Sequence, residues 1–520
     1  MCRPTLLVLA LGLVLGLWRI GSVGLTDPSE GRYAEIAREM ADSRDWLVPR
    51  LWGVVHLEKP PLAYWLGAAA IRIGGRTEWA VRLFPLLALL GTAILAAGIA
   101  RRVAGAGASP LAAAAIMLAP YPLSVGPALL TDVFVLLGVT LFHHSALRHE
   151  RKECPSAANV AALGLAIGFL AKGHTVFLFT LLPLLLTAPR RLRLLLRPGP
   201  LLCFLLPAVP WFVAIQMRYP EFLSTHAGKL ADFVAEGEQH HRAPFYVYVA
   251  TLALGVAPFT LGLVPGIRAI APAERRVLLA WLLVPLAVLT AIRSRSWTYI
   301  LPSVPPLAVL GAAGYAATDA AYRRRLRGGL CLGGGGIALL ATILLPSESA
   351  LGRAAPMALP LAIALCLGGA AILLWRGAPR GATAILLAFA VGAALVQAAA
   401  HFETPFKIHR RLAARIASEL DPGRPLVAFD VVLPSLAFYL DRPVVTAGLH
   451  GRVGAEARLW GASPLYRPEA RLEALFLMRP APLIVLPRAA LERVAPDHSP
   501  VLVEGDCCVI DAIGGPPRAP

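Results

Sequence analysis

Long apolar segments recur along almost the whole chain and constrain its fold more than any other sequence feature. They are about 15–22 residues long, separated by short polar breaks, and this length crosses a hydrocarbon core of roughly 30 Å. Of the 520 residues, 57% are hydrophobic and only 15% are charged, whereas soluble globular chains carry about 25% charged residues. The sequence therefore predicts a polytopic α-helical membrane protein and excludes a disordered or fibrous chain.

We expect about thirteen transmembrane helices. The first apolar run continues beyond a signal-peptide core with no small-residue cleavage site, so we expect it to remain as an uncleaved span. The predicted spans cover residues 5–24, 79–100, 110–126, 127–147, 158–171, 173–188, 199–216, 245–265, 276–292, 298–317, 328–345, 356–375 and 381–400.

Basic residues gather in alternate loops between these spans, which is typical of cytoplasmic loops. This pattern, rather than nucleic-acid binding, accounts for the net charge of +18. We therefore expect a multi-pass protein of the inner membrane with a cytoplasmic N-terminus and a periplasmic C-terminus. Two long loops, 25–78 and 217–244, then lie outside. The basic groups are Arg3, Arg101-Arg102, Arg148 to Lys152, Arg190 to Arg197, Arg268 to Arg276, Arg323 to Arg327 and Arg376 to Arg380.

The tail after residue 401 differs from the rest of the chain. Residues 403–420 and 488–494 have helical patterns, and 426–430, 437–439, 483–486 and 501–509 have strand patterns. We expect a membrane domain over 1–401 and a small periplasmic α/β domain over 402–520. The adjacent Cys507 and Cys508 are expected to be packing residues within a strand.

The first outer loop begins with a polar helical segment. Tyr33, Ile36, Ala37 and Met40 are spaced as one apolar face, which predicts an amphipathic helix that can lie on the outer membrane interface. Asp27 at the N-cap, Pro28 at N1 and Glu30 at N3 fit a capping-box variant. Either carboxylate could cap the helix while the other acts as a general base.

Glu58 and Lys59 precede two prolines, which place both side chains on a stiff non-helical segment. A solvated ion pair is the plainest interpretation. However, only five of the 49 basic residues are lysines, and three of these, Lys59, Lys172 and Lys229, are predicted at the outer face. A lysine ammonium is a compact point charge suited to a phosphate oxygen. Lys172, at a span boundary, fits interface anchoring equally well.

Other outer segments add imidazoles and cations. His240-His241 could ligate a metal, although adjacent side chains diverge in regular structure. A divalent metal could also use Glu58, His56 or Asp132, but Asp132 is better explained as a cap of the span that it begins.

The loop motifs resemble those of the bacterial aminoarabinose lipid A transferases and, more distantly, the protein O-mannosyltransferases of the GT-C glycosyltransferase class. The likeness covers residues 1 to about 320 by motif. The motifs are Asp27-Pro-Ser-Glu-Gly-Arg-Tyr-Ala-Glu-Ile, Asp45-Trp-Leu-Val-Pro, Glu58-Lys-Pro-Pro-Leu, Ala171-Lys-Gly, His240-His-Arg-Ala-Pro-Phe and Tyr299-Ile-Leu-Pro.

The resemblance implies a GT-C fold and a polyprenyl-phosphate sugar donor. It also implies a lipid (lipid A-like), glycan or protein acceptor at the outer face of the inner membrane. Glu58 matches a family site position and is a catalytic candidate. An acceptor hydroxyl needs a carboxylate to take its proton, and Glu30 or Asp27 is the candidate for this base. The substrate-binding residues that the resemblance implies are Arg32, Tyr33, Lys59, His226, Lys229, His241, Arg242 and Tyr299.

Two positions depart from the family pattern. The family places Asp three residues before the arginine of the Arg-Tyr pair, where this chain has Ser29, and Tyr where it has His56. The first difference leaves the identity of the base open, and both leave the sugar and the acceptor open.

A polyprenyl-linked lipid flippase or transporter and an envelope assembly protein are the alternative functions. A transporter is expected to carry ionisable residues within its spans, and these spans have almost none. An assembly protein has no need of the Glu58-Lys59 and Lys229 arrangement.

Overall fold

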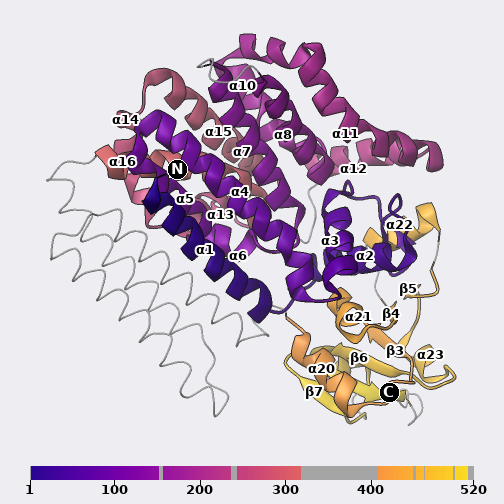
Figure 1. Ribbon diagram of the computed structural model, residues 1–520. Coiled ribbons are helices and arrows are strands. Elements are labelled where there is room, and N and C mark those ends of the chain that lie inside the picture. Colours follow the sequence, from indigo (N-terminus) through magenta and orange to yellow (C-terminus); the bar gives the residue numbers. More distant parts are fainter. Residues whose placement is uncertain are drawn as a thin grey trace, which may run out of the picture. The chain divides into compact units, whose positions relative to one another are not determined.

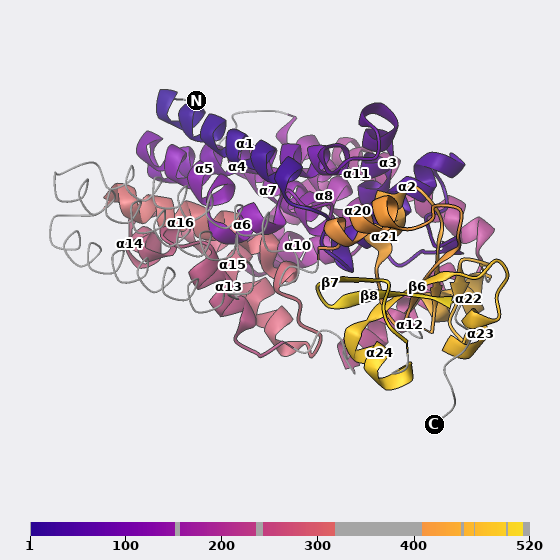
Figure 2. The same ribbon diagram turned by 90° about the horizontal axis from the view of Figure 1, so that it is seen from below.

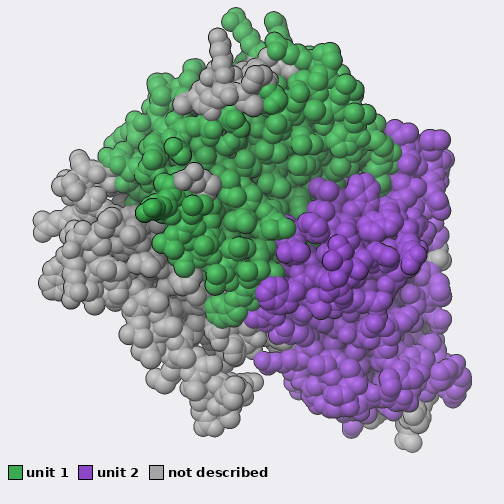
Figure 3. Space-filling view, viewed as in Figure 1, with its two compact units in different colours: residues 1–20, 85–212, 223–398 green, residues 21–84, 213–222, 399–520 purple. Residues whose placement is uncertain are grey.

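The computed structural model describes residues 2–150, 156–235, 243–317, 408–448, 452–461, 463–495 and 498–512. The chain forms two compact units, which Figure 3 colours separately. Unit 1 contains Met1–Ile20, Pro85–Phe212 and Leu223–Ala398. Unit 2 contains Gly21–Phe84, Val213–Phe222 and Ala399–Pro520.

Helices make up nearly all of the described part of the chain before residue 318 (Figure 1). In order they are α1 (Arg3–Ser22), α2 (Ser29–Ser43), α3 (Leu62–Gly74), α4 (Glu78–Ala104), η1 (Ala106–Ala108), α5 (Ser109–Met117), α6 (Pro120–Val125), α7 (Thr131–Glu150), α8 (Ala157–Lys172), α9 (Thr175–Phe179), α10 (Leu181–Thr187), η2 (Pro189–Leu196), α11 (Pro198–Arg218), α12 (Phe222–Ala235), α13 (Val247–Gly255), η4 (Phe259–Gly262), α14 (Leu263–Ala269), α15 (Pro272–Ala291), η5 (Trp297–Ser303) and α16 (Val304–Ala317).

Four of these helical segments are long and apolar enough to cross a membrane: α1, α4, α11 and Trp297–Ala317. A fifth candidate is the pair α13 and Phe259–Ala269, which bends by 94° at the break. The chain is therefore a multi-pass membrane protein. Two predicted spans are each broken into two short helices, 110–126 into α5 and α6 and 173–188 into α9 and α10. The predicted spans 328–345, 356–375 and 381–400 lie outside the described residues.

Glycines allow α7 and α8 of unit 1 to pack closely. A Cβ atom added at Gly138 would stand 2.5 Å from the carbonyl oxygen of Gly164, and one added at Gly164 would stand 2.6 Å from that of Gly138. Membrane helices associate through such small residues because lipid leaves little hydrophobic gain between helices.

In unit 2 the first outer loop folds as α2, the two-stranded β1 (Arg50–Leu51) and β2 (Val54–Val55), and α3. The predicted helix is confirmed, and Tyr33, Ile36, Ala37 and Met40 are all buried. This apolar face packs against α3 and α21 (Pro434–Leu440). Protein rather than lipid therefore covers this face, and a place of the helix at the membrane interface stays a prediction.

The tail of unit 2 contains a six-stranded mixed sheet in the order β5-β4-β3-β6-β8-β7. The four strands β3 to β6 run parallel along β5-β4-β3-β6, whereas β8 pairs antiparallel with β6 and with β7. The elements are α20 (Arg410–Glu419), β3 (Leu426–Phe429), α21, β4 (Val444–Ala447), α22 (Arg452–Trp460), β5 (Tyr466–Arg467), α23 (Leu472–Phe476), β6 (Leu483–Pro487), α24 (Arg488–Val494), β7 (Leu502–Glu504) and β8 (Cys507–Asp511).

Both faces of this sheet are covered by helices (Figure 2). Side chains of α20 and α21 pack with Val485 and Cys507 on one face, and side chains of α23 and α24 pack with Ile484 and Cys508 on the other. The central strands are continuously apolar because both of their faces are buried. Cys507 and Cys508 point to opposite faces and act as core residues, in agreement with the sequence prediction.

The strand predicted at 437–439 is wrong, because these residues lie in α21. Pro434 occupies the first turn, where a proline favours helix initiation. Leu433, Leu436 and Ala437 then bury one helical face against the sheet. The strands β4 and β5 were not predicted.

Candidate functional site

The β1–β2 turn and the two prolines that follow position the end of the first outer loop. Trp52 and Gly53 both have positive φ, as the type I′ turn of a two-residue hairpin requires. Glu39 of α2 accepts hydrogen bonds from the amides of Trp52 (2.6 Å) and Gly53 (3.0 Å). Glu58 and Lys59 follow this hairpin and precede α3, on the non-helical segment that the sequence predicts.

Three predicted site residues of unit 2 converge on a fourth, Glu58. Its carboxylate lies 3.4 Å from Lys59 Nζ, 3.6 Å from His56 Nε2 and 3.9 Å from the Arg32 guanidinium. We call Arg32, His56, Glu58 and Lys59 the Glu58 cluster. The side chain of Lys59 is 29% exposed, whereas that of Glu58 is 10% exposed, so the ammonium can reach a ligand.

Aromatic rings and charge hold Arg32 in place. The rings of Tyr33 and Tyr64 stack at 5.4 Å, and the Arg32 guanidinium lies 5.8 Å from the Tyr33 centroid. Burial lowers the pKa of Arg32, but Glu58 together with Tyr33, Tyr64 and Glu456 more than offsets this effect, so the pKa lies above its usual value. Arg32 is therefore a permanent cation at the cluster.

Glu30 forms a buried ion pair with Arg82 at the start of α4. Arg82 Nε and Nη2 each lie 2.6 Å from a Glu30 oxygen, and Arg82 also donates to the carbonyls of Val23 and Gly24. Glu30 accepts a further hydrogen bond from the Thr26 amide at 3.1 Å. The donor is the residue before the predicted N-cap, so this bond is not the back-bond of the predicted capping box.

Asp27 is not the N-cap of α2, which makes no side-chain capping bond. Instead its carboxylate accepts hydrogen bonds from the backbone amide and the hydroxyl of Ser435 on α21. Burial raises the pKa of Asp27 to about 8, although the bonds from Ser435 oppose the shift. The capping prediction failed because a partner distant in sequence competes for the carboxylate.

In unit 1, Lys172 lies 2.6 Å from Asp132 and 4.3 Å from the centroid of the Tyr299 ring. Asp132 is in the first turn of α7 and Lys172 in the last turn of α8. The contacts bring together the end of one predicted span, the start of another and a predicted substrate-binding tyrosine. The Lys172 ammonium is therefore engaged in an ion pair with Asp132 and a cation–π contact with Tyr299.

The remaining predicted residues are placed as follows. His226 is half-buried on α12, and Lys229 lies on the same helix with a side chain outside the described set. His240, His241 and Arg242 lie outside the described residues. Within the described ranges, no three His, Cys, Asp or Glu side chains come together as a metal ligand set. The metal prediction at His56, Glu58 and Asp132 stays a prediction.

Three further residues, which were not predicted from the sequence, bind predicted site residues directly. Arg82 pairs with Glu30, Ser435 with Asp27 and Glu456 with His56. The last two lie about 400 positions away in the chain. Only Arg82 carried a local signal, a lone charge near the start of an apolar span.

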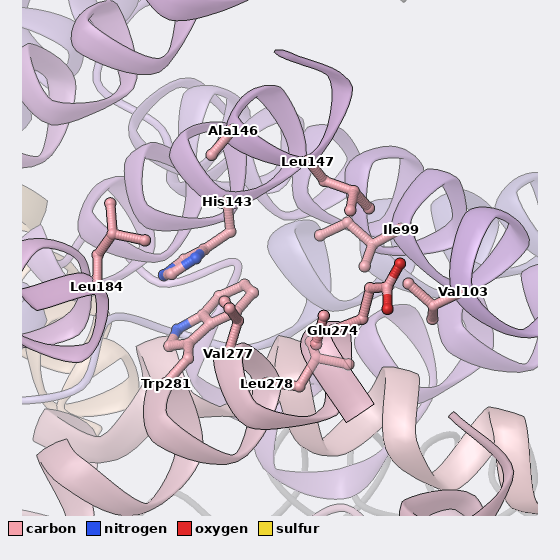
Figure 4. Close-up of a pocket in the computed structure, with 11 residues that line it drawn as sticks. Ile99, Val103, His143, Ala146, Leu147, Leu184, Glu274, Val277, Leu278 and Trp281 are labelled. Carbon is pink, nitrogen blue, oxygen red and sulfur yellow. The ribbon is translucent and has the colours of Figure 1, made fainter. Parts of the chain in front are cut away.

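A separate pocket lies among α4, α7, α10 and α15 of unit 1 (Figure 4). Its lining is mainly aliphatic, with Glu274 at one side. The His143 ring stacks on Trp281 at 3.9 Å, and its Nε2 lies 2.9 Å from the carbonyl oxygen of Phe179. A buried histidine with this partner is adequately explained as a packing residue.

Comparisons with known proteins agree with this architecture. A family model described as dolichyl-phosphate-mannose-protein mannosyltransferase matches residues 58–215. The chain has the fold of ArnT from Cupriavidus metallidurans, with a TM-score of 0.81, 21% identity and 99% coverage of both chains for the apo form. The form bound to undecaprenyl phosphate gives a TM-score of 0.80, again with 21% identity and 99% coverage of both chains. The fold is thus that of these two solved ArnT structures.

Sequence comparison finds relatives that are more similar to the chain than these solved structures. The chain is 36% identical over 310 residues to undecaprenyl phosphate-alpha-4-amino-4-deoxy-L-arabinose arabinosyl transferase 1 of Sodalis glossinidius, covering 56% of this chain and 54% of that protein. A similarly named protein of Pseudomonas aeruginosa is 33% identical over 362 residues, covering 66% and 64%. The chain spans little more than half the length of the first curated relatives that it matches. The chain is similar to these arabinosyl transferases, and the resemblance indicated by its loop motifs is confirmed.

Proposed function

We propose that this protein is a membrane glycosyltransferase that moves a sugar from a polyprenyl-phosphate donor to an acceptor at the outer face of the inner membrane. The observation that carries the proposal is the Glu58 cluster, where Arg32 and the partly exposed Lys59 flank one carboxylate. The names of the relatives suggest undecaprenyl phosphate as the carrier and 4-amino-4-deoxy-L-arabinose as the sugar. The acceptor proposed is lipid A or a similar lipid, glycan or protein.

The reaction breaks the bond between the sugar C1 and the phosphate oxygen of the donor. The bonding electrons go to that oxygen, which leaves as part of a polyprenyl phosphate monoester, and an acceptor oxygen forms the new bond to C1. Negative charge therefore grows on the leaving phosphate. Cations already in place at its oxygens stabilise the transition state without reorganising. Lys59 and Arg32 are the proposed phosphate ligands, with Lys229 and Arg242 as further candidates.

An acceptor hydroxyl must lose its proton during transfer, and a positioned base contributes about 10²–10⁴-fold. Glu30 is a weak base because its two oxygens are paired with the buried Arg82. Asp27 also accepts two hydrogen bonds, but from the neutral Ser435 rather than from a cation. Burial raises the pKa of Asp27 to about 8, near the value that such a step needs. We therefore assign the base to Asp27 in preference to Glu30. An acceptor phosphate is already ionised and needs neither.

The proposal includes the finer architecture: thirteen spans within a membrane domain of residues 1–401, and a periplasmic domain of 402–520. A cytoplasmic N-terminus then puts the Glu58 cluster in the periplasm, where an outer-face acceptor is available.

The test incubates purified protein in lipid nanodiscs with radiolabelled undecaprenyl-phosphate sugar and lipid A. Labelled lipid A is the expected product, and the Lys59→Ala variant is expected to form none. No transfer by the wild-type protein to lipid A, glycan or protein acceptors would contradict the proposal. Movement of the intact labelled donor between leaflets, without transfer, would point to a flippase instead.

A further inference from the structure

A buried histidine–carboxylate pair joins the first outer loop to the tail within unit 2. His56 Nδ1 lies 2.6 Å from a Glu456 oxygen, and both side chains are at most 2% exposed. His56 comes just after β2, whereas Glu456 lies on α22, 400 positions later. No local sequence pattern links the two residues.

The chemistry of this pair orients the imidazole. The bond is short, and it fixes the orientation of the imidazole ring whichever of its two atoms holds the proton. The other ring nitrogen, Nε2, then faces the Glu58 carboxylate at 3.6 Å. A carboxylate that holds one ring nitrogen sets the direction in which the other points, as in many functional histidines.

The segment around the pair is firmly anchored, so α22 is held against the hairpin. α22 packs against β2, and the Trp52 ring stacks on Tyr466 at 5.9 Å with the planes 8° apart. A carboxylate costs free energy to bury unless it is well bonded. A purely apolar contact would therefore join the loop to the tail at lower cost than Glu456 does.

We propose that Glu456 is a positioning residue of the donor-phosphate site. It orients His56, whose ring lies beside Glu58 and so limits where Arg32 and Lys59 can flank a phosphate. The inference rests on the proposed function, and it gives the C-terminal α/β domain a role: this domain supplies one side of the phosphate-binding loop.

The test measures the binding of undecaprenyl phosphate without a sugar, and separately kcat and KM for the sugar-loaded donor, on the full-length protein in nanodiscs. Glu456→Ala is expected to weaken binding and lower kcat/KM about 10–100-fold, the usual effect of losing a residue that orients a ligand-binding group. Glu456→Gln, which keeps an acceptor for Nδ1, is expected to recover most of the affinity. In Glu456→Ala, the decrease in kcat/KM should come mainly from a higher KM.

Two controls separate positioning from general stability. Asp511→Asn breaks the 2.6 Å ion pair with Arg424 inside the same domain; it should lower the thermal midpoint but leave affinity unchanged. A double-mutant cycle with His56→Asn should show that the second change adds almost nothing to the first, because both act through one contact.

Binding by Glu456→Ala within twofold of wild type, or full additivity with His56→Asn, would overturn the inference while leaving the proposed function intact. A wild-type protein that neither binds undecaprenyl phosphate nor transfers sugar would instead overturn the proposed function. A wild-type protein that binds without transferring, and loses binding in Glu456→Ala, would retain the positioning role and lose the assigned reaction.

Discussion

Lys59 is the residue of the Glu58 cluster best placed to meet a phosphate, since its ammonium is 3.4 Å from Glu58 and partly exposed. Lys59→Ala should reduce transfer to background without lowering the thermal midpoint, because a partly exposed ion pair contributes only about 0–1 kcal/mol. Lys59→Arg should restore part of the activity, since charge is kept but the compact geometry is lost. Radiolabel transfer and thermal unfolding provide the measurements.

Arg50→Ala is the matched control for Lys59. Arg50 lies in the same loop, has a similar exposure and pairs with Asp45 at 3.7 Å. It should retain transfer within about twofold, as expected for an exposed pair. Equal losses in the two variants would reduce Lys59 to an ordinary surface charge.

Glu30 and Arg82 form the ion pair on which the start of α4 depends, and both side chains are at most 2% exposed. Glu30→Gln should destabilise the protein by about 3–5 kcal/mol, because the buried Arg82 guanidinium loses the carboxylate that neutralises its charge. Adding Arg82→Met to Glu30→Leu should recover much of the loss. Thermal unfolding of the single and double variants tests this, and a single variant as stable as wild type would refute it.

Asp27 should make stability and activity depend on pH in opposite directions. The folded protein holds this proton up to about pH 8, whereas an unfolded aspartate releases it near pH 4. The stability that the group contributes is therefore present below about pH 4 and is lost as pH rises through about 8. As a base, the same group makes kcat/KM rise with pH towards 8.

Asp27→Asn should flatten the decline of the thermal midpoint between pH 5 and 8 and should abolish transfer to a hydroxyl acceptor. Ser435 can still donate to the Asn oxygen, so the fold should survive. Full transfer by this variant would mean that the acceptor supplies its own anion, as a phosphate does.

The sequence predicted the site best where a residue's neighbours decide its conformation. The prolines after Lys59 kept Glu58 and Lys59 out of a helix, and the apolar spacing of α2 marked the face that is buried. The role of Asp27 could not be predicted, because Ser435 lies 408 positions away and offers two donors where the helix offers its first amides. The same distance in sequence hid Glu456.

At the scale of single elements, α7 and α8 depend on the absence of side chains where they cross. Gly138→Ala would place a Cβ 2.5 Å from a backbone oxygen of Gly164, and that atom can move only with its helix. We expect a loss of about 1–3 kcal/mol, the usual cost of overpacking. Gly107→Ala, whose added Cβ meets nothing within 4 Å, is the control and should be neutral. Thermal unfolding in detergent measures both, and equal midpoints would contradict the close-packing argument.

The ends of helices could be predicted where a local property sets them, and not where the rest of the fold decides. Apolar length located α1, α4 and α11 closely, because the bilayer sets that length. It did not reveal the breaks between α5 and α6 or between α9 and α10, since a broken span has nearly the same composition as a continuous one. In the tail, buried parallel strands and short buried helices have equally apolar sequences. Residues 437–439 were therefore assigned to a strand although they belong to α21.

At the scale of the whole molecule, unit 2 constrains the topology that the basic loops predict. The first outer loop and the tail share buried contacts, Asp27 with Ser435 and His56 with Glu456. They must therefore lie on the same side of the membrane, and an even number of spans must separate residue 78 from residue 402. The sequence predicts twelve spans in that interval, nine of them before residue 318.

A topology reporter tests this parity directly. A reporter that is active only outside the cytoplasm should be active when fused after Pro520 and when inserted in the 25–78 loop, and silent when fused after Arg102 or inserted at residues 323–327. An insertion in the 217–244 loop should also be active, because six predicted spans separate it from the first outer loop. Opposite results at Pro520 and in the 25–78 loop would be incompatible with the contacts of unit 2. Silence at both sites would place the Glu58 cluster in the cytoplasm, away from an outer-face acceptor, and would contradict the proposed function.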